Sequence, residues 1–155
     1  MTPDTLVSPS PDAVGTRAAY FVSDIASPHV LSQTINVGPG RYIFGLSTYA
    51  TANGLKNKGD ASFTASFAGV TAANLMVSSQ PSKTWQLFSA PVTIAAAGPQ
   101  TITLRFSTNF KPSKDIVVDR VHVMAVPEPQ SWAMMILGFG MVAGALRRRH
   151  AALQA

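Results

Sequence analysis

The chain has no cysteine, and only 12% of its 155 residues are charged. The lack of cysteine excludes disulfides, thiol catalysis, zinc–thiolate sites and iron–sulfur clusters. Ser, Thr, Gly, Pro and Ala are abundant instead, and short apolar alternations run between them. This composition favours an exported all-β protein.

Acidic residues are also scarce, since residues 1–126 hold six Asp and no Glu. A carboxylate pair for glycoside hydrolysis would have to come from those six. His29, His122 and His150 share no metal-ligand spacing, and no GxSxG nucleophile elbow is present. We therefore expect no enzyme and no catalytic residue.

The formal net charge of +5 raises the question of nucleic-acid binding. The only dense basic cluster is Arg147-Arg148-Arg149, directly after an apolar run. Nucleic-acid binding would require a basic stripe with interleaved aromatics, and the sequence has none. We expect no nucleic-acid partner.

Residues 1–15 are rich in Pro and Ser and lack the basic and apolar regions of a signal peptide. We expect a disordered N-terminal segment here. An exported chain needs a signal peptide, so we expect one upstream of the printed start.

Residues 16–126 form one predicted domain of short strands separated by turn residues. In Thr101–Ser107, apolar residues at 102, 104 and 106 alternate with polar ones, as in a half-buried antiparallel strand. Strands at roughly ten-residue spacing predict an all-β, jelly-roll-like antiparallel β-sandwich. The predicted strands are Ala18–Val22, Val30–Val37, Arg41–Tyr49, Ala61–Phe67, Ala73–Val77, Trp85–Ile94, Thr101–Ser107 and Ile116–Val126.

The composition changes at Pro127-Glu128-Pro129, because two prolines cannot continue a central strand. The uncharged segment 132–146 follows, and at 1.5 Å per residue it spans roughly 22 Å as a helix. An interfacial Trp132 and a snorkelling arginine would extend its reach toward the ~30 Å hydrocarbon core. A buried core helix is the alternative, but Arg147-Arg148-Arg149 directly after it favours a transmembrane helix. The positive-inside rule then places residues 151–155 in the cytoplasm and the sandwich outside.

The order of these elements resembles the PEP-CTERM sorting domain, in its PEPxxWA variety, over residues 127–150. The resemblance implies export, transient anchoring in the inner membrane, processing by an exosortase, and delivery to the cell surface or extracellular matrix, in association with exopolysaccharide. The chemistry would belong to the exosortase. By the same resemblance, the sorting and processing motif consists of Pro127, Glu128, Pro129, Trp132 and Ala133, and the stop-transfer cluster of Arg147, Arg148 and Arg149.

The ectodomain is similar, more loosely, to galactose-binding and carbohydrate-binding-module sandwiches. The similar segments are Ser32-Gln33-Thr34 through Gly40-Arg41-Tyr42, Thr84-Trp85-Gln86 and Val118–Val121. This resemblance implies an alternative function, a module that grips a polysaccharide through exposed aromatics. A secreted hydrolase is a third alternative. Candidate stacking residues are Trp85, Tyr42 and Tyr49, and Tyr20 is a further possibility. Packing in the core or at its rim is the competing role for Trp85.

Asp119 has an unusual position in the last predicted strand. Alternation with Val117 and Val121 would turn its carboxylate inward, where a charge is costly unless it is paired or metal-bound. In the carbohydrate modules that the domain resembles, an acid near the last strand can help to hold a structural calcium. Asp119 is therefore a candidate calcium ligand, and no other cofactor is expected. A β-bulge, or an ion pair with Arg120 or Arg105, is the competing explanation.

Overall fold

The computed structural model describes residues 17–22, 28–108, 110–127 and 134–141. The chain divides into two compact units, Met1–Ala125 and Val126–Ala155. The expected N-terminal segment 1–15 and the tail 151–155 lie outside the described residues. The first unit contains β1 (Ala19–Phe21), β2 (His29–Val37), β3 (Gly40–Ala50), β4 (Ala61–Phe67), β5 (Val70–Met76), β6 (Trp85–Ile94), β7 (Gly98–Thr108), β8 (Ile116–Ala125) and the 3₁₀ helices η1 (Gly54–Lys56) and η2 (Val77–Ser79).

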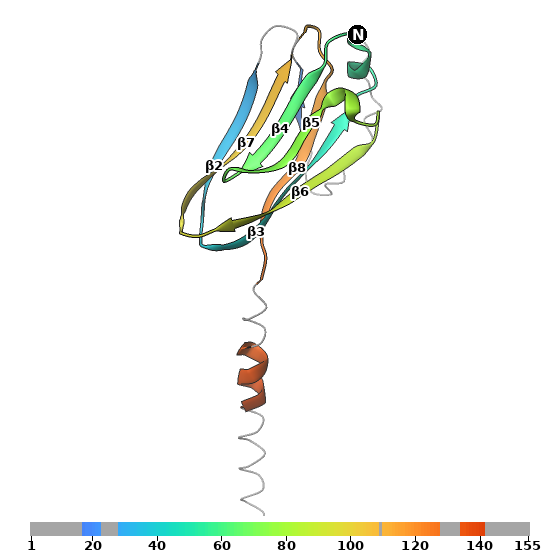
Figure 1. The fold of residues 1–155 in the computed structure, drawn as a ribbon. Coiled ribbons are helices and arrows are strands. Elements are labelled where there is room, and N and C mark those ends of the chain that lie inside the picture. The colour runs from blue at the N-terminus through green and yellow to red at the C-terminus, as the bar shows by residue number, and fades with distance from the viewer. Residues whose placement is uncertain (1–16, 23–27, 109, 128–133, 142–155) are drawn as a thin grey trace, which may run out of the picture. The chain divides into compact units, whose positions relative to one another are not determined.

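The eight strands form two four-stranded antiparallel sheets, which lie as two layers (Figure 1). Sheet A has the order β1-β8-β3-β6, and sheet B has the order β2-β7-β4-β5. Every connection except the β4–β5 hairpin crosses from one sheet to the other. This is the strand order of a jelly roll. The prediction of an all-β antiparallel sandwich is confirmed.

The central strand β4 shows why these segments form strands. Along Ala61–Phe67, buried residues alternate strictly with half-buried ones. Antiparallel pairing with β5 and β7 holds the strand on both sides, and a slip of one residue would turn its two phenylalanines away from the core. The period-two pattern of the sequence therefore determines which face of this strand is buried.

The strand β5 begins at Val70 rather than at the predicted Ala73. The difference comes from the turn before it, in which Ala68 and Gly69 have φ values of 49° and 80°. Positive φ at both central residues is the requirement of a tight type I′ hairpin. Alanine rarely adopts it, so the sequence carries no strong turn signal here.

Five buried phenylalanines, contributed by both sheets, form the centre of the core. The ring of Phe21 lies 5.9 Å from that of Phe106 and 5.8 Å from that of Phe63. The rings of Phe44 and Phe67 lie 5.9 Å apart across the two sheets. Burying each such side chain contributes about 1.5–3 kcal/mol. The core therefore holds the two sheets, and with them their outer faces, in a defined arrangement.

Candidate functional site

A row of side chains that is mostly aromatic crosses all four strands of sheet A. Tyr20 pairs in register with Val117, Val117 with Tyr49, and Tyr49 with Trp85. Among their chain neighbours, Phe21 in β1, Ala50 in β3, and Ile116 and Val118 in β8 belong to the hydrophobic core. Because side chains alternate along a strand, the row lies on the outer face of sheet A. We call these four residues the aromatic row.

The members of the aromatic row differ in exposure. Tyr49 is only 2% exposed, Trp85 is half-buried, and Tyr20 is 54% exposed. The rings of Tyr49 and Trp85 lie 5.2 Å apart. The ring of Tyr49 therefore supports the indole and is not itself available for stacking. The hydroxyl of Tyr20 donates to Oδ2 of the buried Asp115 at 2.7 Å, which orients this ring at the other end of the row.

Tyr42, another predicted stacking residue, is not part of the row. It packs against the core cluster, and its hydroxyl donates to the carbonyl of Gly38 at 2.9 Å. Its partner in β6 is the buried Val92, so its ring lies on the inner face. The structure thus brings together Tyr20, Tyr49 and Trp85 and separates Tyr42 from them.

The middle of the same outer face is built around small residues of β3. Ser47 lies between Leu87 of β6 and Asp119 of β8, and Gly45 pairs with His122. Leu87 is 66% exposed. An aliphatic side chain and a carboxylate therefore adjoin the aromatic row, and the imidazole lies one outward position further along the strands. Sequence reasoning missed Leu87, although its position two residues after Trp85 in the same strand places both side chains on one face. It also missed His122, which strand pairing places opposite Gly45 on this face.

Asp119 does not point inward, so that prediction is wrong: it shares a face with Val117, as predicted, but this is the outer face, and its alternation with Val121 is broken. The register between β3 and β8 shifts at this point, and Arg120 has a φ of 53°. Two residues of β8 here oppose one of β3, which is a β-bulge. Val118 faces the core, whereas Asp119 lies opposite Ser47 on the outer face and accepts a hydrogen bond from the amide of Arg120 at 2.7 Å. The β-bulge, one of the explanations that the sequence left open, is therefore present.

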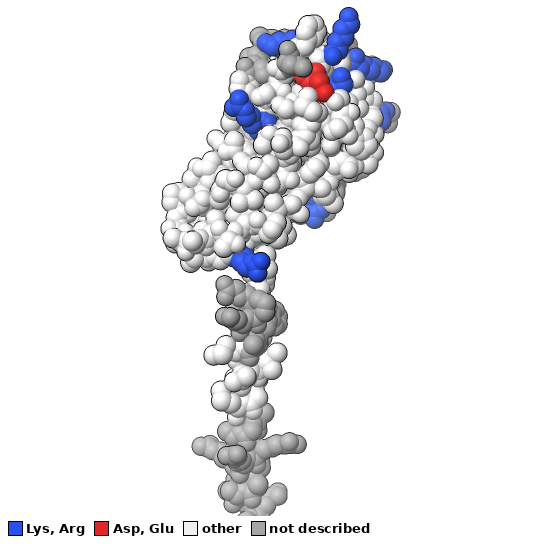
Figure 2. Space-filling view, in the orientation of Figure 1, with Lys and Arg blue, Asp and Glu red and all other residues white. Residues whose placement is uncertain are grey.

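Charged side chains are sparse on the sandwich. In the face that Figure 2 shows, basic side chains lie at separate places and several gather at one end. Within the described part of the chain, no three His, Asp or Glu side chains gather in a way that could hold a metal ion. Calcium binding by Asp119 stays a prediction.

Asp60 links the start of β4 to η2 through hydrogen bonds. Its Oδ1 accepts hydrogen bonds from the amides of Ala61 at 2.8 Å and Ser78 at 3.1 Å, and its Oδ2 accepts one from the Ser78 hydroxyl at 2.5 Å. Burial raises the pKa of Asp60, but these hydrogen bonds and the charge of Lys114 outweigh burial and lower the pKa below its ordinary value. The ammonium of Lys114 also donates to two main-chain carbonyls of the 57–59 loop. These contacts give Asp60 a structural role.

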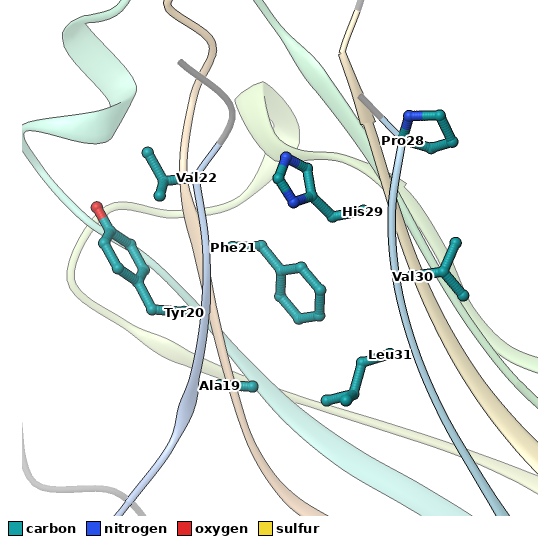
Figure 3. Close-up of a pocket in the computed structure, with 8 residues that line it drawn as sticks. All are labelled: Ala19, Tyr20, Phe21, Val22, Pro28, His29, Val30 and Leu31. Carbon is teal, nitrogen blue, oxygen red and sulfur yellow. The ribbon is translucent and has the colours of Figure 1, made fainter. Parts of the chain in front are cut away.

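A cavity of about 610 Å³ lies between β1 and β2, at the edges of the two sheets (Figure 3). Phe21, His29 and Leu31 point into it, whereas Tyr20 and Val30 point away. The rings of Phe21 and His29 also contact Phe106 of the core. His29 is the one titratable residue whose side chain points into this cavity, so the described lining offers no acid–base pair.

The predicted sorting motif lies mostly outside the described residues. Pro127 is exposed and follows the end of β8 at Ala125 by two residues. A helix of residues 134–141 falls inside the segment 132–146 that the sequence predicts to be helical. No helix in the described ranges has the length and apolar character needed to cross a bilayer. The predicted motif residues outside the described ranges are Glu128, Pro129, Trp132, Ala133, Arg147, Arg148 and Arg149.

The chain is similar in structure to several solved proteins. The C-terminal domain of EclA, a sugar-binding protein, superposes with a TM-score of 0.52 at 15% identity, over 78% of this chain and 86% of that one. A family 61 carbohydrate-binding module in complex with β-1,4-galactotriose gives a TM-score of 0.46 at 16% identity, over 70% of each chain. A family 16 carbohydrate-binding module gives 0.46 at 17% identity, over 71% of this chain and 77% of that one. The likeness to the EclA domain shows a shared fold.

The tail is identified more specifically. Residues 125–149 match the PEP-CTERM protein-sorting motif, so the chain carries this sorting signal where the sequence predicts it. The match begins at Ala125, the last residue of β8. None of the curated proteins matches the chain.

Proposed function

We propose that the chain is an exported protein that the segment 132–146 holds transiently in the inner membrane. An exosortase then processes it at Pro127-Glu128-Pro129, and it is delivered to the cell surface or extracellular matrix. The match of residues 125–149 to the PEP-CTERM motif carries this proposal. In this scheme the sandwich is the cargo, and the catalytic chemistry belongs to the processing enzyme.

The position of the motif supports accessibility to a protease. β8 ends at Ala125, so the prolines follow the sheet rather than interrupt it. Two prolines around one residue restrict the backbone to extended conformations and remove donors for strand pairing. With a helix beginning a few residues later at the membrane interface, Glu128 would lie just outside the bilayer, within reach of a membrane-embedded enzyme.

The test expresses the full chain behind a working signal peptide in strains with and without an exosortase. We expect the Glu128→Ala variant to insert normally and to lose release, whereas Gln130→Ala, which changes a neighbouring position, is released like the wild type. The mass of the surface-released form is the measurement. Equal release in both strains, or a released form that retains residues 132–155, would contradict the proposal.

A second function, polysaccharide binding, is favoured by the outer face of sheet A. Trp85 is half-exposed there, braced by Tyr49 from β3 and flanked by the exposed Leu87. A rigidly held indole is suited to stack on the apolar face of a sugar ring, and Asp119 could accept hydrogen bonds from its hydroxyls. The sugar-binding EclA domain with the same fold supports this proposal. The ligand would be the neutral or weakly charged polymer of the host's own matrix.

Affinity electrophoresis tests this second function, with gels that contain the exopolysaccharide of the organism that makes this protein. We expect Trp85→Ala to weaken the retardation by about tenfold or more in apparent affinity, as truncation of an aromatic residue at the centre of a binding site does. Phe110→Ala removes another exposed aromatic, 58% exposed and in a loop, and should leave the affinity unchanged. Equal retardation of wild type and Trp85→Ala would exclude the aromatic row as the binding site.

A further inference from the structure

The four edge strands of the sandwich differ in how they are protected against pairing with another strand. β1 has only three residues, β6 carries Pro91 inside the strand, and β5 shifts register against β4. Short length, proline and bulges are the devices by which natural sheets block pairing at their edges. Three of the four edges are therefore protected.

The fourth edge, β2, has none of these devices. Its nine residues, His29–Val37, include no proline and no Lys, Arg, Asp or Glu. Its register with β7 is unbroken from end to end, and within the described residues it pairs on that side only (Figure 1). Residues 30–34 are all exposed, Val30 by 54% and Leu31 by 51%. A long, regular, uncharged edge of this kind is a template for a further strand.

We propose that β2 pairs antiparallel with β2 of a second copy of this chain, about a two-fold axis at Gln33. The pairing would join the two B sheets into one continuous sheet of eight strands. The same surface would be used by both copies, as a two-fold interface requires. This inference is independent of the proposed function, because it concerns the edge of sheet B and not the aromatic row.

The side chains of β2 match those of a second β2 in this register. Residues of one parity meet residues of the same parity, so the inner face of one strand continues the inner face of the other. Leu31 would lie opposite Ile35 of the second copy, and Ser32 opposite its Thr34. A charged side chain near the two-fold axis would lie close to the same side chain of the second copy and be repelled by it. β2 carries no Lys, Arg, Asp or Glu, so this repulsion does not arise.

The surface beside Leu31 gives this pairing an apolar component. A cavity of about 310 Å³ opens there, with Leu31, Ile102, Leu104 and Val121 among its lining residues. Leu31 and Val121 are exposed by 51% and 40%. Ile35 of the second copy would cover part of this surface. Backbone hydrogen bonds would then be accompanied by burial of apolar side chains, which strand addition needs for stability.

The experiment measures the oligomeric state of the full chain in non-ionic detergent by sedimentation velocity. We expect a dimer for the wild type and for Asn74→Lys, which places the same charge on the β5 edge. Gln33→Lys should weaken dimerisation about fivefold or more, because two lysines would face each other. Mixing Gln33→Lys with Gln33→Glu should restore the dimer, which also shows that both variants fold. A wild type that stays monomeric, or a dimer that Gln33→Lys leaves intact, would overturn the proposal.

The absence of cysteine allows a second test of the register. Gln33→Cys would carry the only thiol of the chain, and mild oxidation should give a disulfide-linked dimer in high yield. Asn74→Cys on the β5 edge should give little. Equal yields from the two variants would mean that the copies do not meet at Gln33.

Discussion

The imidazole of His122 lies against the backbone of Gly45, its cross-strand partner. A Cβ on Gly45 would come within 2.6 Å of Cε1 and 2.7 Å of Nε2 of that ring. On its other side, Nδ1 of His122 lies 2.8 Å from the carbonyl oxygen of Arg120, in the β-bulge. A carbonyl oxygen only accepts, so Nδ1 is the donor. The ring is thus held between the bulge and a residue without a side chain.

We expect Gly45→Ala to lower the free energy of unfolding by about 1–2 kcal/mol, because the ring must move and lose its bond to the bulge. The cost should be smaller in a His122→Ala background, because the two closest contacts of the added methyl group are then gone and the next, to the carbonyl oxygen of Phe88, is 3.3 Å. Urea unfolding of the four chains of this double-mutant cycle is the measurement. The same cost in both backgrounds would contradict the contact.

The lowered pKa of Asp60 makes a pH-dependent contribution to stability. A carboxyl whose pKa is lower in the folded state stabilises above its unfolded pKa, near 3.8, and this stability is lost as the pH falls through the folded value. Asp60→Asn should therefore cost about 1 kcal/mol at pH 7, and the difference from wild type should shrink at pH 3. Denaturant unfolding at the two pH values is the measurement. A difference that stays constant would show that the carboxylate charge is not involved.

The sandwich should fold without the tail. All residues of the hydrophobic core cluster lie between Phe21 and Val118, inside the unit that ends at Ala125. A chain that ends at residue 126 should give a β-type far-UV circular dichroism spectrum. It should unfold in one cooperative thermal transition with the same midpoint temperature as the full chain. A helical or aggregated product would contradict this domain boundary.

The arginines at 147–149 should set the orientation of the tail. Replacing all three with alanine should move a fraction of C-terminal fusions out of the cytoplasm, because the positive-inside bias is lost. Replacing them with lysine keeps the charge and should keep the orientation. A reporter that is active only in the cytoplasm, fused after Ala155, measures both. No change on alanine replacement would remove these arginines as the stop-transfer cluster.

The period-two alternation of apolar and polar residues predicted the strands well where it was strong. β4 has the predicted bounds, Ala61–Phe67, and β6 has the predicted bounds, Trp85–Ile94. It failed where the backbone adopts a conformation that its residue types rarely show. The hairpin at Ala68 and the bulge at Arg120 both have non-glycine residues with positive φ, and neither has a composition signal.

The candidate site was predictable only in part. Tyr20, Tyr49 and Trp85 were singled out as aromatics, but Tyr20 and Trp85 are 65 positions apart in the sequence, and only pairing through β8 and β3 aligns them. Tyr42 was included although alternation places it on the same face of its strand as Phe44 and Leu46, opposite Tyr49. Whether an aromatic ring is a platform or part of the core depends on which face of which sheet it occupies.

Two properties of this protein depend on local order along the chain: the period-two alternation of the strands and the PEP-CTERM signal that follows them. Both depend on consecutive residues only. No contact between distant parts of the chain is needed to produce the alternation or to recognise the signal. The tertiary structure alone decided the jelly-roll order of the strands, the outward turn of Asp119, the aromatic row and the unprotected edge of β2. Each of these depends on which strands pair and in which register, and pairing is chosen by the burial of the whole core rather than by any one segment.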